Sequence, residues 1–481
     1  MSRMSVLMIL ILSPTLLHPQ SPGTVSNRAG IRASLDSLVE ATTRSLPLAG
    51  ASVLALHGED TLVAHAAGYA DLENRVPASL GTVYRIISLT KQFTAAAILQ
   101  LVERGAIRLE DDLGKYVPEY SKQKKPVTIL QLLNHTSGVR DFDDIGDRFW
   151  DLAGREASQK EFLSLIRDQP LDFTPGTRWY YSNTGYYLLG VLLERVTGQT
   201  YAEYIREHVA RPAGLTATTY CDNRLLLVNR AQGYDAVGVE FLNAPRMSGA
   251  SGFSTAGLCS TATDLVTWAR ALASGKVISN ASYQLMITPV GAAARASPPY
   301  GFGVWVIDHE GRRHISHLGQ AGGYSAVLSS SSDSVTIAVL TNTSGSGATV
   351  LGQQLGSMIR QMPPPPLQRA SKLTQPSRKP LSQTERKRYV GRYRLREIRD
   401  DGSLGIRRVT LEVFEENGRL AAQLTGDPVE ELVSIDGDNF VALLRPDLHF
   451  RFIVKQGGAA SVTHVGPYGR YEGPRSRDST Q

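Results

Sequence analysis

The sequence of 481 residues contains only two cysteines, Cys221 and Cys259. Two cysteines are too few for a small disulfide-based scaffold and for a thiolate metal cluster. Cys259 lies in a short run of small and apolar residues, where a buried thiol is the simplest interpretation. A Cys221–Cys259 disulfide is the alternative if the chain is exported, and the spacing of the two residues does not decide between them.

Common nucleotide- and metal-binding motifs are absent. The sequence has no Gly-x-x-x-x-Gly-Lys-Ser/Thr phosphate loop, no dinucleotide-binding glycine motif, no His-Glu-x-x-His and no Cys-x-x-Cys. The Gly-x-Ser-x-Gly nucleophile elbow is also missing, although Gly249-Ala250-Ser251-Gly252 comes close to it. We therefore expect a protein that needs no metal and no other cofactor.

Positive charge is concentrated in one segment. The whole chain has 51 Lys and Arg against 45 Asp and Glu, a net charge of +6. Residues 361–399 hold 11 basic residues and two acidic ones, so this segment alone carries +9 and the rest is close to neutral. We expect no nucleic-acid partner for the folded body. The basic segment is most simply a solvated linker, and contact with the surface of the cell envelope is the alternative.

The N-terminus has the layout of an export signal. Arg3 precedes an unbroken apolar run, residues 6–12, which is too short to cross a bilayer but fits the core of a signal peptide. We expect residues 1–20 to be a signal peptide or, alternatively, a short uncleaved anchor. The polar residues 19–30 are expected to be a leader. The predicted location is periplasmic or secreted.

The remaining sequence predicts two domains joined by a linker. The first domain spans residues 31–360. Four consecutive prolines begin a basic, Ser/Gln-rich linker over residues 361–380. Short β segments at near-regular spacing follow in residues 381–475 and predict a small all-β barrel or sandwich.

The first domain has the pattern of an α/β (α+β) fold. A hairpin comes first, helices occupy the middle and further strands come late, which predicts an antiparallel sheet with a helical subdomain. The predicted hairpin strands are 51–56 and 61–66, the helices are 88–104, 128–133, 158–167, 185–196, 200–209, 264–273 and 349–360, and the late strands are 302–307, 313–316, 326–329 and 335–340.

Three short motifs carry residues suited to catalysis. In Ser88-Leu89-Thr90-Lys91, the i,i+3 spacing lets the lysine reach the serine hydroxyl, which needs a nearby base to become a nucleophile. In Tyr181-Ser182-Asn183, the phenol can carry a proton and the amide can bind a substrate amide. In His317-Leu318-Gly319-Gln320, the glycine lets a substrate backbone lie along a sheet edge.

Each motif alone also has a structural explanation. The first is compatible with a helix cap and a surface lysine, the second with a strand-end tyrosine and an asparagine cap, and the third with a structural turn histidine.

Together, the three motifs in this order resemble those of the serine β-lactamase and penicillin-binding-protein superfamily. The segments 132–138 (Leu-Leu-Asn-His-Thr-Ser-Gly) and 175–177 (Pro-Gly-Thr) are also similar to that family. The resemblance covers about residues 35–360 and implies a β-lactamase/transpeptidase-like fold. The region 389–471 resembles the small β-barrel (lipocalin-like) domain that follows many such hydrolases.

The resemblance also suggests a subclass. Tyr-x-Asn as the second motif is similar to class C β-lactamases, family-VIII-type esterases, D-aminopeptidases and DD-carboxypeptidases. His317 stands where class C β-lactamases usually have lysine. A histidine is mostly neutral at pH 7, so it would hold a substrate carboxylate less firmly, and strong β-lactamase activity is not expected.

The mechanism implied by the resemblance is acyl transfer without a cofactor. Tyr181, its phenolate favoured by Lys91, would take the proton of Ser88, which then attacks an amide or ester carbonyl. The backbone N–H groups of Ser88 and Gln320 would bind the oxyanion. The substrate-positioning residues would be Asn183, His317 and Gly319. D-amino peptides, β-lactams and esters all remain open as substrates, and loops such as 141–155 and 291–299 are expected to decide among them.

Two other functions stay open at this point. One is a penicillin-binding sensor that acylates Ser88 once without turnover. In the other, the C-terminal β domain is the functional part and the hydrolase is secondary. His135, in the segment similar to the family, is interpreted as a structural turn residue.

Overall fold

The computed structural model describes residues 23–121, 125–155, 157–237, 240–309, 311–360, 381–398, 404–416, 418–424, 430–442, 449–455, 458–466 and 469–476. The predicted signal peptide, residues 1–20, and the predicted linker, residues 361–380, lie outside the described residues. No helix within the described part of the chain is both long and apolar enough to cross a lipid bilayer.

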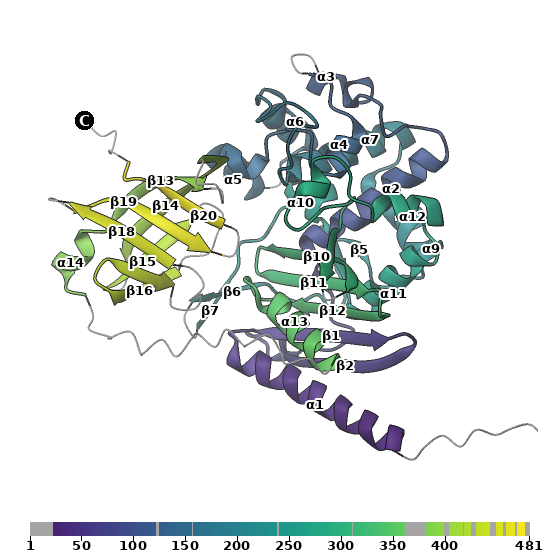
Figure 1. Ribbon diagram of the computed structural model, residues 1–481, viewed down its shortest axis with the longest axis horizontal. Helices are drawn as coiled ribbons and strands as arrows, with labels where there is room; N and C mark the ends of the chain where they lie inside the picture. The colour runs from purple at the N-terminus through teal and green to yellow at the C-terminus, as the bar shows by residue number, and fades with distance from the viewer. Residues whose placement is uncertain are drawn as a thin grey trace, which may run out of the picture.

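A seven-stranded antiparallel sheet forms the centre of the first domain (Figure 1), with the strand order β3-β2-β1-β12-β11-β10-β9. The strands are β1 (Gly50–His57), β2 (Asp60–Asp71), β3 (Val76–Pro77), β9 (Trp305–His309), β10 (Arg312–Ala321), β11 (Tyr324–Ser331) and β12 (Val335–Thr341). β1 pairs with β12, with Val53 opposite Val339, and so joins the N-terminal hairpin to the late strands. The predicted antiparallel sheet, built from distant parts of the chain, is confirmed.

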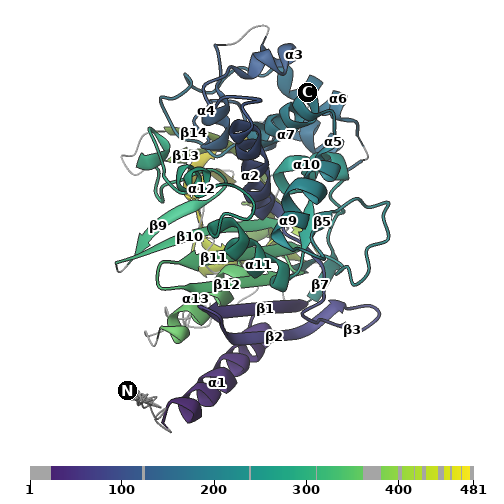
Figure 2. The ribbon, with the colours of Figure 1, turned by 90° about the vertical axis from the view of Figure 1, so that its right-hand side faces the viewer.

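Two helices from opposite ends of the domain cover one face of this sheet. α1 (Gly23–Ser45) and α13 (Gly347–Ile359) contact each other and pack on β2 and β12, and Figure 2 shows α1 below β1 and β2. Leu35 and Val39 are fully buried in this layer. Residues 23–30 of the expected leader form the first turns of α1, which continues without a break into the turns that carry these apolar residues.

The helical subdomain covers the other face. Its central helix, α2 (Thr90–Glu103), is buried from Thr90 to Leu101, and α11 (Ala262–Ala273) packs on β1 and β12. The other helices are α3 (Pro118–Ser121), α4 (Ile129–Leu133), α5 (Asp147–Ala153), α6 (Gln159–Arg167), α7 (Asn183–Thr197), α8 (Tyr201–Tyr204), α9 (Arg211–Ala213), α10 (Gly249–Ala256) and α12 (Asn280–Met286). Capping boxes begin α4, α6 and α8, which is why a Ser or Thr precedes each.

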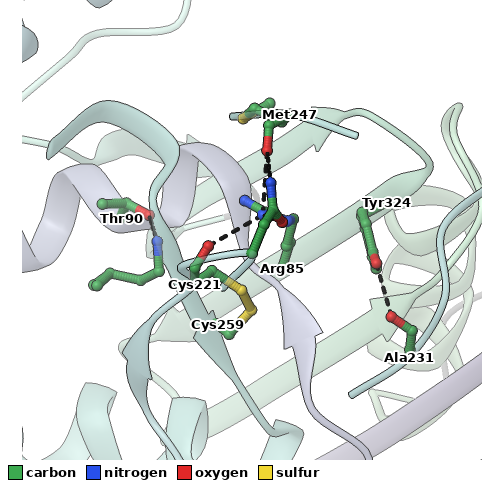
Figure 3. Close-up of a disulfide and its surroundings, with 9 residues drawn as sticks. Arg85, Thr90, Cys221, Ala231, Met247, Cys259 and Tyr324 are labelled. Carbon is green, nitrogen blue, oxygen red and sulfur yellow. Dashed lines mark hydrogen bonds between the residues drawn. A yellow bond between two sulfur atoms is a disulfide. The ribbon is translucent and has the colours of Figure 1, made fainter. Parts of the chain in front are cut away.

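A second, three-stranded sheet supports the segment that leads into α2. β4 (Tyr84–Arg85) and β5 (Thr219–Tyr220) flank β8 (Leu258–Ser260), and β6 (Tyr234–Val237) pairs separately with β7 (Glu240–Asn243). Cys259, in β8, forms a disulfide with Cys221, which follows β5 (Figure 3), and this decides between the two interpretations of the cysteines. The backbone N–H of Leu258 donates to the Thr90 hydroxyl at 3.2 Å, so the disulfide-bonded sheet is tied directly to the start of α2.

The C-terminal domain is a closed eight-stranded barrel, which confirms the all-β prediction. Its strands are β13 (Gly391–Ile398), β14 (Leu404–Glu416), β15 (Arg419–Leu424), β16 (Glu430–Asp436), β17 (Asn439–Ala442), β18 (His449–Lys455), β19 (Gly458–Gly466) and β20 (Gly469–Pro474). Tyr389, Tyr393, Phe440 and Phe452 form an aromatic core inside it. The short helix α14 (Gln383–Lys387) precedes the barrel.

Part of the basic segment lies in α14 and in the first strand of the barrel. Arg386 and Lys387 lie in α14, and three arginines of the segment lie on β13. One of them, Arg392, forms an exposed ion pair with Glu412 on the neighbouring strand. The positive charge of residues 361–399 is therefore shared between the predicted linker and a folded strand.

Candidate active site

Ser88 lies in a strained turn just before α2. The turn is a 3₁₀ helix, η1 (Ile87–Leu89), and α2 begins only at Thr90, so Ser88 precedes the helix in whose first turn it was expected. Ile87 has a φ of 46°, a left-handed conformation that is costly for a β-branched residue. Ile87 and Leu89 are buried, whereas the serine between them is partly exposed. The turn thus presents the Ser88 hydroxyl while its neighbours anchor it.

Lys91 is fully buried beside this hydroxyl. Its Nζ donates to Ser88 Oγ at 3.1 Å, to Asn183 Oδ1 at 2.8 Å and to the Thr255 carbonyl at 3.2 Å. Burial lowers the pKa of Lys91 to about 7, although the carboxylates of Asp141 and Asp143 act in the opposite direction. A lysine with a pKa near neutrality can accept a proton from a hydroxyl at physiological pH.

The ring of Tyr181 lies against the side chain of Lys91. The Lys91 Nζ is 4.8 Å from the centre of the tyrosine ring. Burial raises the pKa of Tyr181 far above its ordinary value, a hydrogen bond with the Ser88 hydroxyl opposes this, and Asp141 and Asp143 raise the pKa further. The resting site therefore favours the neutral phenol, in contact with Ser88, over a phenolate.

Asn183 is the first residue of α7, whose N-terminus is capped by the Ser182 hydroxyl. Its side-chain oxygen accepts from Lys91, and its side-chain nitrogen donates to Asp143 Oδ2 at 3.1 Å. Its backbone N–H donates to the Asp141 carboxyl. The second motif is thus connected to the first through the asparagine amide.

His317 lies within β10 and is buried. Its Nε2 is 3.0 Å from the Tyr300 hydroxyl and its Nδ1 is 2.7 Å from the Leu318 carbonyl. Because a carbonyl only accepts, Nδ1 carries the proton and Nε2 accepts from the tyrosine. Burial and the nearby positive charge of Lys91 lower the pKa of His317 to about 3, so the imidazole is neutral at pH 7.

Gly319 brings β10 against the turn that holds Ser88. A Cβ atom on Gly319 would lie 2.3 Å from the Ile86 carbonyl oxygen and 3.0 Å from the Ser88 nitrogen. Only glycine allows this approach, since real side-chain carbons do not come so close to backbone. Gln320 follows in the strand, paired in register with Ser325 of β11.

Sequence reasoning missed two sets of residues around the site. Asp141 and Asp143 contact Asn183, and Tyr300 contacts His317. The loop beginning at Asp141 was expected to shape the substrate pocket, but no motif distinguished its carboxylates. His135 is buried and accepts from the Ser182 backbone N–H at 3.1 Å, which fits its structural interpretation.

No group of three or more His, Cys, Asp or Glu side chains among the described residues is arranged to hold a metal ion.

Comparisons with known proteins agree with this fold and layout. The sequence model of the Beta-lactamase family matches residues 35–354. Penicillin-binding protein 4* of Bacillus subtilis is 32% identical over 295 residues, which cover 58% of this chain and 64% of that protein. The matched region is thus less than two thirds of that relative's own length.

Two solved structures extend the comparison. The octameric penicillin-binding protein homologue from Pyrococcus abyssi has a TM-score of 0.62 at 23% identity, covering 92% of this chain and 99% of that one. The D-stereospecific amidohydrolase from Streptomyces sp. has a TM-score of 0.57 at 26% identity, covering 66% of this chain and 97% of that one. The fold is therefore of the β-lactamase/transpeptidase-like class. The family model matches more than half of this chain, so the chain belongs to the beta-lactamase family.

Proposed function

We propose that this protein is a serine hydrolase that cleaves an amide or ester through an acyl-enzyme intermediate on Ser88. The observation that carries the proposal is the 3.1 Å contact between Ser88 Oγ and the buried Lys91 Nζ, together with the lysine pKa of about 7. A base with a pKa near the working pH, within hydrogen-bond distance of a hydroxyl, is what an activated serine needs.

In the first step, Lys91 takes the proton of the Ser88 hydroxyl while Ser88 Oγ bonds to the substrate carbonyl carbon. The carbonyl electrons move to the oxygen, which the N–H groups of Ser88 and Gln320 stabilise. When the tetrahedral intermediate collapses, the leaving group takes a proton from the Tyr181 phenol, and the Lys91 ammonium replaces it. This assignment makes Lys91 the first base, because burial disfavours the Tyr181 phenolate that the resemblance implied.

In the second step, water hydrolyses the acyl-enzyme. The water oxygen bonds to the acyl carbonyl carbon while one water proton passes through Tyr181 to Lys91. When the ester bond to Ser88 Oγ then breaks, the Lys91 ammonium returns that proton to the serine. Asn183, whose amide contacts Lys91, and the Gly319 edge of β10 position the acyl group.

The proposed substrates are short acyl esters and amides or peptides of D-amino acids. The D-stereospecific amidohydrolase, at 26% identity, supports the amide class. The neutral, hydrogen-bonded His317 offers no positive charge to a substrate carboxylate, which argues against an efficient β-lactamase. An exported location is part of the proposal, supported by the Cys221–Cys259 disulfide, since disulfides persist in oxidising compartments. Contact of the basic segment with the cell envelope is proposed as well, on its charge alone.

Steady-state hydrolysis of p-nitrophenyl acetate and of a chromogenic cephalosporin, with Ser88→Ala beside the wild type, tests the proposal. Ester turnover that the variant loses, with slow cephalosporin cleavage, is the expected result. Rapid cephalosporin cleavage would contradict the argument from His317, and a single acylation without turnover would favour the sensor.

A further inference from the structure

The loop after Gly138 forms a tight turn with two carboxylates that face the active site. The turn is the 3₁₀ helix η3 (Phe142–Ile145), and Asp141 caps it by accepting the Asp143 backbone N–H at 2.9 Å. Phe142 anchors the turn in the core, where its ring stacks on Phe149 at 4.3 Å. The carboxylates are thus carried by a fixed turn rather than by a loose loop.

These carboxylates accept hydrogen bonds from both nitrogen atoms of Asn183. The buried Asp141 carboxyl accepts the backbone N–H, and Asp143 Oδ2 accepts from the side-chain Nδ2 at 3.1 Å. An amide that donates through its nitrogen toward Asp143 must turn its oxygen the other way. That oxygen accepts from Lys91 Nζ at 2.8 Å.

We propose that Asp141 and Asp143 are positioning residues for this reaction, which fix the Asn183 amide so that its oxygen faces Lys91. The inference rests on the proposed function and deepens it. A flipped amide would direct its NH₂ group at the lysine nitrogen, and Lys91 would lose one of its acceptors near Ser88. The aspartates act through Asn183, and neither one is assigned a contact with the substrate.

The two carboxylates differ in how they can be tested. Asp141 is buried, and burial together with Asp143 and Asp144 raises its pKa well above the ordinary value, so replacing it risks the fold. Asp143 is exposed, and its negative charge raises the pKa of Lys91. The groups that face Lys91 from the surrounding elements are Ser88, His135, Asp141, Asp143, Tyr181, Asn183, Tyr186 and His317.

Two substitutions of Asp143 separate its hydrogen bond from its charge. Asp143→Asn keeps an oxygen that can accept from Asn183 but removes the charge, whereas Asp143→Ala removes both. The matched control is Glu110→Gln, because Glu110 is exposed in the turn after α2 and contributes to none of these pKa shifts. The assay is the pH profile of kcat/KM for p-nitrophenyl acetate, measured at low salt and in 1 M NaCl.

We expect Asp143→Asn to keep its plateau kcat/KM within about threefold of wild type and to move the acidic limb down by about half a pH unit at low salt. This shift should shrink at 1 M salt, where charges are screened beyond roughly 3 Å. Asp143→Ala should show the same shift and lose about tenfold in plateau kcat/KM. Loss of charge alone would move the acidic limb of both variants equally and leave their plateaus equal, whereas a merely structural role would lower both plateaus together with thermal stability.

The inference is overturned if Asp143→Ala has the plateau kcat/KM of Asp143→Asn and of the control Glu110→Gln, whatever its acidic limb does. If Ser88→Ala retains wild-type ester turnover, the proposed function fails and the positioning role fails with it. If Ser88→Ala is inactive while Asp143→Ala behaves like the control, only the positioning inference fails. Thermal denaturation of each variant identifies loss of folding, and Asp143→Asn, which keeps the acceptor, remains informative if Asp143→Ala does not fold.

Discussion

Replacing Gly319 by alanine should damage the active site more than the fold. The new methyl group would lie 2.3 Å from the Ile86 carbonyl oxygen and 3.0 Å from the Ser88 nitrogen. An ordinary contact between carbon and a backbone atom needs about 3.4 Å or more, so strand and turn must separate by roughly 1 Å. A displacement of about 1 Å of reacting groups costs on the order of 100-fold in rate. Overpacking of this kind costs about 1–3 kcal/mol of stability.

Hydrolysis of p-nitrophenyl acetate and thermal denaturation together test this prediction. Gly81→Ala is the control, because a Cβ atom there meets nothing closer than 3.7 Å. The expected result is a kcat/KM about 100-fold below wild type for Gly319→Ala in a protein that still unfolds cooperatively, and little change for Gly81→Ala. A folded Gly319→Ala protein with kcat/KM within threefold of wild type would refute the reasoning about this contact.

Three further predictions concern the burial of Lys91 and the disulfide. Lys91 must be neutral to accept the proton, and burial lowers its pKa to about 7. We therefore expect kcat/KM to fall about tenfold per pH unit below pH 7 and to level off above it. A flat pH profile from pH 5 to 8 would contradict this. Lys91→Met should lower kcat by roughly 10²–10⁴ without changing the ester KM more than a few fold, whereas a raised KM with kcat unchanged would show a binding role instead. The Cys221–Cys259 bridge closes 38 residues, so the double serine variant should lose about 4 kcal/mol in urea unfolding, and an unchanged midpoint would show that the bridge adds no stability.

The sequence was most informative where a pattern is local. The i,i+3 spacing of Ser88 and Lys91 corresponds to the observed contact, because the contact spans a single turn of backbone, although Ser88 lies in η1 and Lys91 in α2. The order of hairpin, helices and late strands was sufficient to predict the antiparallel sheet. The helix predicted over 158–167 corresponds to α6 (Gln159–Arg167), so its start was predicted within one residue.

Contacts between distant segments could not be predicted in the same way. The pairing of Asp143 with Asn183 joins residues 40 apart, and no periodicity relates them. The disulfide was left open for the same reason, since spacing does not reveal which cysteines meet. The helix α1 (Gly23–Ser45) was not predicted, because its first turns are polar and its contacts with β2 and α13 join segments distant in the sequence.

The most direct test of the account is intact-mass and peptide-mapping analysis of an acid-quenched reaction with p-nitrophenyl acetate. The proteins to compare are the wild type, Ser88→Ala and Ser251→Ala. Ser251 is the control because it lies in the segment that comes close to a nucleophile elbow, and its hydroxyl donates to the Ser248 carbonyl. The account predicts one acetyl group on the peptide containing Ser88 in the wild type and in Ser251→Ala, and none in Ser88→Ala. Undiminished acylation and turnover in Ser88→Ala would contradict the central claim.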